Sequence, residues 1–196
     1  MRLSALLLIL AVACATPSSS TAPSAAPAAA APAAAAPTPA TAAPAPVATP
    51  TVVTATLESR SNSTVTGSAR ITPSASGVVV MVEVQGASPG EHGVHVHDKG
   101  DCSAPDATSA GPHFNPKAAP HHGGVSTPVR HGGDLGNMQV DSNGKGLVVV
   151  TVADLTMDNV VGRSVVVHAG KDDLQSDPAG NSGARVACGT LKPAAQ

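Results

Sequence analysis

The strongest constraint on the fold of this chain is a series of short β-branched runs separated by residues typical of turns. Val-Val-Val-Met-Val-Glu-Val and Leu-Val-Val-Val-Thr-Val are two such runs, and Gly, Pro, Asn and Asp stand between the runs. Val and Thr favour strands, whereas Gly, Pro, Asn and Asp favour turns. We therefore expect strands over residues 51–59, 64–72, 77–85, 93–97, 137–140, 146–152, 164–168 and 184–191.

No segment shows a convincing helical period, so this pattern predicts an all-β fold. Eight short strands with turns are typical of a Greek-key sandwich or barrel. The single aromatic residue is Phe114, so the core must consist of Val, Leu, Ile, Ala and Met. Residues 99–133 and 169–183 show no strand pattern. Loops of this length in a compact domain are usually functional, and the expected fold is an eight-stranded Greek-key barrel or sandwich with two long functional loops.

The first 50 residues differ in composition from the rest of the chain. An apolar run over residues 3–13 follows Arg2 and is typical of a signal peptide, because it is too short to cross a bilayer. Leu-Ala-Val-Ala-Cys14 resembles a bacterial lipobox, in which Cys14 would carry lipid, but Ala13-Cys14-Ala15 also fits ordinary signal cleavage. We favour the lipoprotein, because residues 15–50 are almost entirely Ala, Pro, Ser and Thr and would act as a tether.

The predicted organisation is thus a signal segment over residues 1–14, a linker over 15–50 and one domain over 51–196. Export leaves Cys102 and Cys188 as an even pair in an oxidising compartment, which favours one disulfide. We expect the protein in the periplasm or cell envelope, in contact with a membrane only through an N-terminal lipid. The net charge of −2 without a basic stripe argues against a nucleic-acid partner.

Seven of the eight histidines fall between residue 95 and residue 168 in positions that favour a metal site. His95 and His97 are two residues apart on an expected strand, so they point to the same face. His168 ends another β-branched run, and His113 lies in a loop bounded by Gly and Pro. The remaining one, His92, is expected at the surface or in a turn.

These residues form two candidate ligand sets. An all-imidazole set suits copper, and it comprises His95, His97, His113 and His168. Three histidines with one carboxylate are the ligands of a closed structural zinc site, and this set comprises His113, His122, His131 and Asp134, in continuation of the first long loop. His113 belongs to both sets, because an imidazole that has lost its proton can bridge two metals.

Five segments together resemble copper/zinc superoxide dismutases over residues 51–192. They are Gly-Glu-His-Gly-Val-His-Val-His, Gly-Pro-His-Phe-Asn-Pro, His-Gly-Gly…Arg-His-Gly-Gly-Asp-Leu-Gly-Asn, Gly-Arg-Ser-Val-Val-Val-His and Ala-Arg-Val-Ala-Cys-Gly. The resemblance implies the Greek-key barrel, the copper and zinc sets given above, and a disulfide between Cys102 and Cys188. It also implies that Arg185 is the active-site arginine and that Asp172 accepts hydrogen bonds from one copper histidine and one zinc histidine.

The function implied by the resemblance is the dismutation of superoxide to dioxygen and hydrogen peroxide. Copper would be alternately reduced and oxidised, zinc would be its structural partner, and Arg185 and His113 would be catalytic. The alternative is a non-catalytic copper- and zinc-binding protein of the cell envelope with the same fold.

The chain departs from the family pattern at four places, and one is the loop of Cys102, in which the Cys directly follows Gly100-Asp101. Val94 replaces a Phe of the family, and the loop before Arg185 is short and lacks the charged guiding residues of some relatives. His121 adjoins His122, so either could be the zinc ligand. We favour His122, because it keeps the following Gly-Gly and the nine-residue step to His131, and we expect His121 to be solvated.

Overall fold

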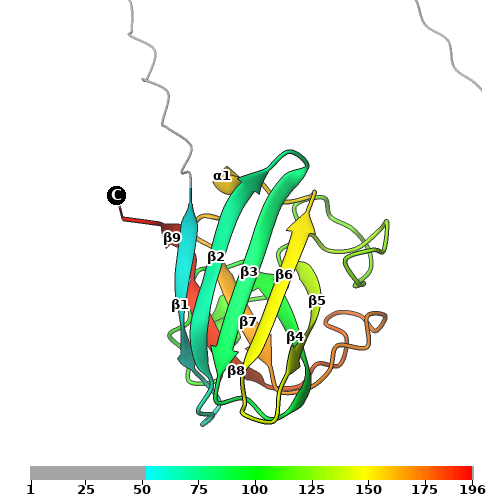
Figure 1. Cartoon of the computed structure of the whole chain (residues 1–196). Helices are drawn as coiled ribbons and strands as arrows, with labels where there is room; N and C mark the ends of the chain where they lie inside the picture. The colour runs from blue at the N-terminus through cyan, green and yellow to red at the C-terminus, as the bar shows by residue number, and fades with distance from the viewer. Residues whose placement is uncertain (1–51, 196) are drawn as a thin grey trace, which may run out of the picture. The chain divides into compact units, whose positions relative to one another are not determined.

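The computed structural model describes residues 52–195, in which antiparallel strands close into a barrel (Figure 1). Two short helical turns accompany the strands, η1 (Thr108–Ala110) and α1 (Met157–Val160). The strands are β1 (Val53–Ser59), β2 (Thr66–Ser74), β3 (Gly77–Gln85), β4 (Gly90–His97), β5 (Asp134–Val140), β6 (Gly146–Val152), β7 (Ser164–His168), β8 (Arg185–Thr190) and the two-residue β9 (Lys192–Pro193).

The order of the strands around the barrel is β1-β2-β3-β6-β5-β4-β7-β8, and β8 returns to β1. All pairings are antiparallel, and β9 adds to β1. Because β3 pairs with β6 and β4 pairs with β7, the chain crosses between the two halves of the barrel instead of forming hairpins throughout. This connectivity confirms the predicted Greek-key barrel.

Alternation of side chains along β3 shows why the sequence forms these strands. Val78, Val80 and Val82 are fully buried in the core, whereas Met81 between them is only partly buried. Strand β7 differs, because its residues are buried on both faces. The segment that contains η1 covers the outer face of β7, where Val166 packs with Ala107, Ala110 and Cys188. A run of buried residues without alternation is the pattern of a strand covered on both sides.

The structure extends three strands beyond the limits expected from sequence, and one of them is β2, which ends at Ser74 instead of residue 72. Strand β4 begins at Gly90 instead of residue 93, and β5 begins at Asp134 instead of residue 137. Asp134 was therefore wrongly assigned to the loop. Helix α1 was not predicted, because a single turn is too short to show a helical period. Thr156 caps it with a reciprocal pair of hydrogen bonds to Asn159.

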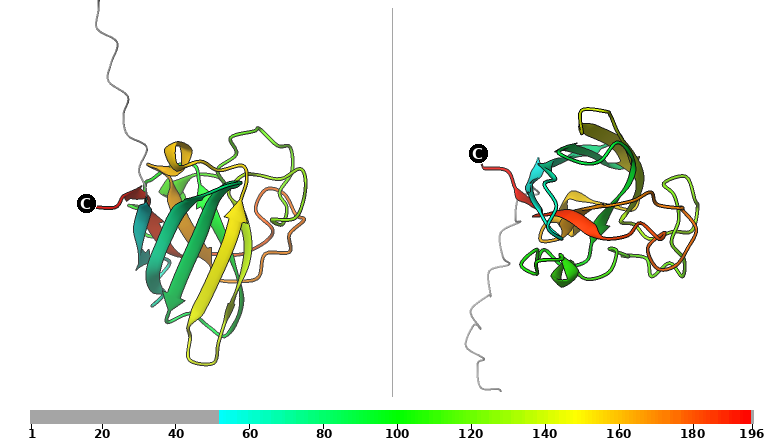
Figure 2. Two further views of the ribbon diagram at one scale, coloured as in Figure 1. Left: turned by 45° about the horizontal axis from the view of Figure 1, so that its top comes forward. Right: turned by 90° about the horizontal axis from the view of Figure 1, so that it is seen from below.

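Two long loops extend from the same side of the barrel in the views of Figures 1 and 2, one with residues 115–133 and one with residues 169–184. The predicted disulfide between Cys102 and Cys188 is confirmed, with its Cα atoms 5.8 Å apart. It joins the segment after β4 to β8. Within residues 52–195, no helix has the length and apolar character needed to cross a membrane.

Candidate metal centre

The four histidines of the predicted copper set come from two strands and one loop. His95 and His97 lie on β4 next to a bulge, and His168 ends β7 at a shift in register. His113 is brought to β4 by an isolated bridge with His97. One nitrogen of each imidazole lies within 4.8 Å of the corresponding nitrogens of the other three. The structure therefore assembles this set, and all four residues are buried.

The facing nitrogens of this set have no hydrogen-bond partner. They are Nδ1 of His95 and Nε2 of His97, His113 and His168. The opposite nitrogens are held: Nδ1 of His97 donates to the carbonyl of Gly111 at 2.8 Å, and Nδ1 of His168 donates to that of Gly183 at 3.1 Å. These bonds fix the rings and turn the free lone pairs toward one point. Buried polar atoms without partners are costly, so the convergence fits a bound transition metal.

The predicted zinc set surrounds one carboxylate oxygen. Oδ1 of Asp134 lies 2.8 Å from Nδ1 of His113, 3.0 Å from Nδ1 of His122 and 3.5 Å from Nδ1 of His131. The contacts of His122 and His131 are close but lack hydrogen-bond alignment. Tetrahedral zinc with ligands at about 2.0–2.1 Å places those ligands about 3.3 Å apart, so the four residues fit this ion.

The backbone fixes Asp134 so that one oxygen remains for the histidines. Its Oδ2 accepts from the amides of Gly123 and His131, each at 3.0 Å. Asp134 itself is fully buried at the start of β5.

Asp172 connects the two sets, as the resemblance implies. Its Oδ2 lies 2.7 Å from Nε2 of His95 and its Oδ1 lies 2.8 Å from Nε2 of His122. Asn137 of β5 pairs with the backbone of Asp172 through two hydrogen bonds of 2.8 Å. Gly180 lies so close that a Cβ atom there would stand 1.8 Å from Oδ1, and its φ of 64° also favours glycine.

The electrostatics of the site favour neutral imidazoles in the copper set. Burial lowers the pKa of His113 to about 4 and that of His168 to about 3, and it also lowers the pKa values of His95 and His97. These imidazoles are therefore neutral at pH 7, with one N–H each, and neutral imidazole is the form that binds metal.

The zinc set has the opposite character and attracts positive charge. Burial alone would lower the pKa of His122, but the carboxylates of Asp134 and Asp172, which lie 3.0 and 2.8 Å from its ring nitrogens, outweigh burial and raise it to about 9. Burial likewise raises the pKa values of both carboxyl groups, yet the hydrogen bonds from the histidines bring them well below their usual range. Two buried carboxylates at this point stabilise a cation, whether a proton or a metal ion.

Arg185 begins β8 opposite His168 in the strand register. Its Nη1 donates to the carbonyl of Ala107 at 2.8 Å, and the side chain is half-buried. The amine of Lys171 forms an ion pair with Glu91 at 2.6 Å.

The adjacent histidines have different positions. His122 belongs to the zinc set, whereas the side chain of His121 is 67% exposed and bonds to Asp177. The Gly-Gly after His122 and its nine-residue step to His131 predict His122 as the zinc ligand, and the structure brings this residue together with His131 and Asp134.

The expectation for His92 was wrong. Only 3% of this residue is exposed, because β4 begins at Gly90 and the loop after β7 covers it. Its Nδ1 lies 2.7 Å from the carbonyl oxygen of His168, and its Nε2 lies 2.8 Å from that of Ser88. His92 therefore supports the backbone of a candidate copper ligand. The sequence offered one sign of this role: His92 stands three residues before His95 in the same motif.

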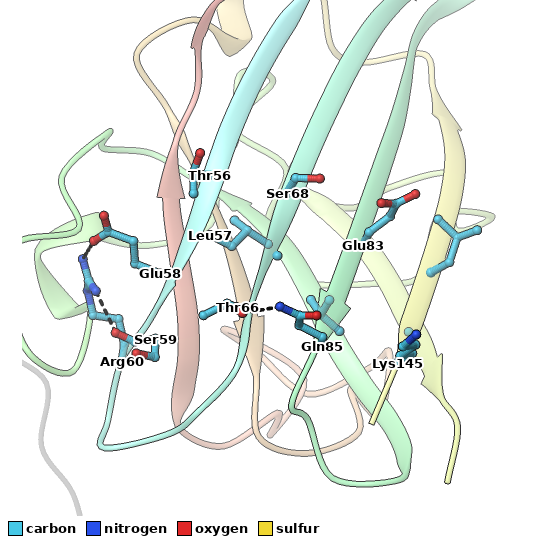
Figure 3. A pocket seen from close by; sticks show the side chains of 14 residues that line it. Thr56, Leu57, Glu58, Ser59, Arg60, Thr66, Ser68, Glu83, Gln85 and Lys145 are labelled. Atoms are coloured by element: carbon cyan, nitrogen blue, oxygen red, sulfur yellow. Dashed lines mark hydrogen bonds and ion pairs between the residues drawn. The ribbon is translucent and has the colours of Figure 1, made fainter. Parts of the chain in front are cut away.

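A separate groove of about 940 Å³ lies on the outer face of β1, β2, β3 and β6 (Figure 3). Charged side chains line it, including Glu58, Arg60, Glu83 and Lys145. No histidine or cysteine lines this groove, so it is separate from the two candidate metal sites.

Comparisons with known proteins agree with this geometry. Residues 65–191 match the family described as copper/zinc superoxide dismutase (SODC). A Cu-Zn superoxide dismutase of Yarrowia lipolytica is 44% identical over 144 residues, which cover 67% of this chain and 92% of that protein. One of Deinococcus radiodurans is 41% identical over 141 residues, covering 65% and 78%.

Two other relatives carry different names. A copper chaperone for superoxide dismutase from Rattus norvegicus is 39% identical over 137 residues, which cover 66% of this chain and 49% of that protein. The crystal structure of the clock protein EA4 superposes with a TM-score of 0.69 at 35% identity, over 76% of this chain and 99% of that one.

The family match covers most of the barrel, and copper and zinc are the cofactors of this family. On the strand order, the two ligand sets and these similarities, the chain belongs to the copper/zinc superoxide dismutase family.

Proposed function

We propose that this protein converts two superoxide anions and two protons into dioxygen and hydrogen peroxide. Copper would bind His95, His97, His113 and His168, and zinc would bind His113, His122, His131 and Asp134. The observation that carries the proposal is the convergence of six buried imidazole nitrogens without hydrogen-bond partners on two points. His113 faces both points, with Nε2 toward one set and Nδ1 toward Asp134.

The residues of the chain divide the work. Copper, when bound, supplies reversible one-electron chemistry. Arg185 binds the anionic substrate through its guanidinium group, which the carbonyl of Ala107 holds in place. His113 would hold a proton at Nε2, when this nitrogen is free of copper, for transfer to the reduced product, while its Nδ1 stays beside Asp134. Asp172 keeps His95 and His122 in fixed orientations.

The second candidate function is metal binding without catalysis. It is supported by the similarity to a protein named as a copper chaperone. The complete copper set and the presence of Arg185 at the start of β8 support catalysis. Metal analysis combined with a superoxide-decay assay on the purified protein separates the two. Superoxide decay that is faster than in buffer alone and that requires bound copper supports the enzyme. Stoichiometric binding of metal without faster decay supports the binding protein.

We also propose that the chain is exported and anchored through lipid on Cys14, with residues 15–50 as a linker to the domain over 51–196. The apolar run before Cys14 and the Ala/Pro-rich composition after it support this arrangement. Residues 1–51 lie outside the described part of the structure. Mass spectrometry of the mature N-terminus in a bacterial host tests it: a diacylated Cys14 supports the anchor, and a free N-terminus at another residue contradicts it.

A further inference from the structure

Asp177 joins the loop of residues 169–184 to the dipeptide that contains a zinc-set histidine. Its Oδ1 accepts from the backbone amide of His122 at 2.6 Å, and its Oδ2 accepts from Nδ1 of His121 at 2.8 Å. Asp172 of the same loop contacts Nε2 of His122 at 2.8 Å. Two carboxylates of one loop thus hold one dipeptide of the other, one at the imidazole and one at the backbone.

The two contacts of Asp177 differ in their surroundings. The side chains of His121 and Asp177 are 67% and 47% exposed, so their contact contributes little in water. His122 itself is only 3% exposed, and its backbone amide needs an acceptor that water cannot readily replace. The bond to the amide of His122 is therefore the contact that positions the ligand.

The turn that presents Asp177 is organised by a different acidic residue. Asp173 accepts from the amides of Gln175 and Ser176 at 3.0 and 2.8 Å and from the side chain of Asn181 at 2.9 Å. All of these partners belong to the same loop. Asp173 thus shapes its own loop, whereas Asp177 bonds to the loop that contains His122. Replacing Asp173 is therefore a matched control for replacing Asp177, because both changes remove one carboxylate from the same loop.

We infer that Asp177 is a positioning residue for the zinc half of the centre. By holding the backbone of His122, it directs Nδ1 toward Asp134 while Nε2 remains on Asp172. The inference rests on the proposed zinc assignment for its consequence, but the hydrogen bond itself does not require a metal.

The first test uses the metal-free full chain and the exchange of the His122 amide, followed by NMR. Asp177→Ala removes the acceptor, and the amide should exchange at least tenfold faster. Asp177→Asn keeps an oxygen acceptor and should restore protection to within about threefold of the parent. Asp173→Ala should leave this amide within the same range. Equal exchange in the parent and Asp177→Ala would overturn the inference, whether or not the parent binds zinc.

The second test measures the release of zinc from the loaded protein to a chromogenic chelator. Loss of a residue that orients a metal ligand typically costs 10- to 100-fold in metal binding, so Asp177→Ala should release zinc roughly 10- to 100-fold faster. Asp177→Asn, His121→Ala and Asp173→Ala should each stay within about threefold of the parent. If Asp173→Ala releases zinc as fast as Asp177→Ala, general loosening of the loop explains the effect and the inference is wrong. A parent that binds no zinc contradicts the proposed function instead, and the amide exchange still decides the role of Asp177.

Discussion

In the proposed function, some side chains of the site bind the metals and another binds the superoxide anion. Each ligand imidazole of the copper set presents a free nitrogen, and its other nitrogen is engaged by a carbonyl or a carboxylate. Arg185 has no place in either set and bonds to the carbonyl of Ala107. Substitutions should therefore separate binding of metal from binding of the anion.

Replacing Arg185 by Ile should lower kcat/KM for superoxide about 10-fold or more while both metals stay bound, because in the proposed function this residue docks the anion. Lys should retain part of the rate, since the charge remains but the planar fork is lost. Pulse measurements of superoxide decay at matched copper content check this. An Ile variant with the parental rate and the parental dependence on salt would show that Arg185 does not face the copper set.

Replacing Asp134 by Ala should weaken zinc binding more than copper binding. The carboxylate contacts three histidines, of which only His113 belongs to the copper set. Because a closed metal site contributes to folding, the zinc-loaded variant should also unfold at a lower temperature. Titration of each metal separately and thermal unfolding provide the measurement. Equal losses for both metals would mean that the two sets cannot be separated.

At the scale of elements, the site depends on contacts between β4, β7 and the loop that follows β7. His92 of β4 spans from the carbonyl of Ser88 to that of His168. The carbonyl of Gly170, two residues after His168, accepts a hydrogen bond from the amide of Gly93 on β4. The position of His168 is thus set by the neighbouring strand as well as by its own.

Replacing His92 by Ala should lower the free energy of unfolding by about 2–4 kcal/mol, because it leaves the carbonyl of His168 without this partner and opens a cavity. It should also weaken copper binding, because the backbone of His168 loses its brace. Urea unfolding of the metal-free protein and a copper competition assay measure these effects. His121→Ala is the control, since that side chain is exposed and should change stability by less than about 0.5 kcal/mol.

At the scale of the whole molecule, the barrel buries a cluster of titratable groups, and this makes the stability of the metal-free protein depend on pH. The folded-state pKa values of His113 and His168 are about 4 and about 3, below the unfolded value of about 6.5. Between these values the unfolded chain binds more protons, so stability falls as pH decreases from 6.5 toward 3. His122 acts in the opposite sense, because its raised pKa of about 9 gives stability that is lost as pH rises from 6.5 through 9.

The metal-free protein should therefore be most stable near pH 6.5 and lose on the order of a few kcal/mol by pH 4. Urea unfolding at pH 4, 6.5 and 9 after removal of metals by chelation provides the measurement. Loading both metals should raise the stability at each pH but leave its fall toward acid at least as steep, because metal binding keeps the imidazoles unprotonated while the unfolded chain still binds protons. A metal-free protein whose stability rises steadily toward acid would contradict these assignments.

Much of the architecture could be predicted from the sequence, because it depends on local chemistry. Alternating valines and turn residues define the strands, and the even number of cysteines after Cys14 leaves one disulfide pair. The spacing of the histidines defines two ligand sets with His113 in common, and the structure assembles both.

Only the tertiary structure decided which neighbouring residues support the ligands. His92 braces His168 over a separation of 76 residues, and Asp177 holds the amide of His122 over 55 residues. Neither role is encoded in a local period or a spacing. Such contacts depend on where a loop crosses the barrel and on which amides and carbonyls it thereby removes from water. That burial is a property of the folded chain as a whole, and for this reason the sequence by itself predicted the two candidate ligand sets, and through the resemblance Asp172, but not the roles of His92 and Asp177.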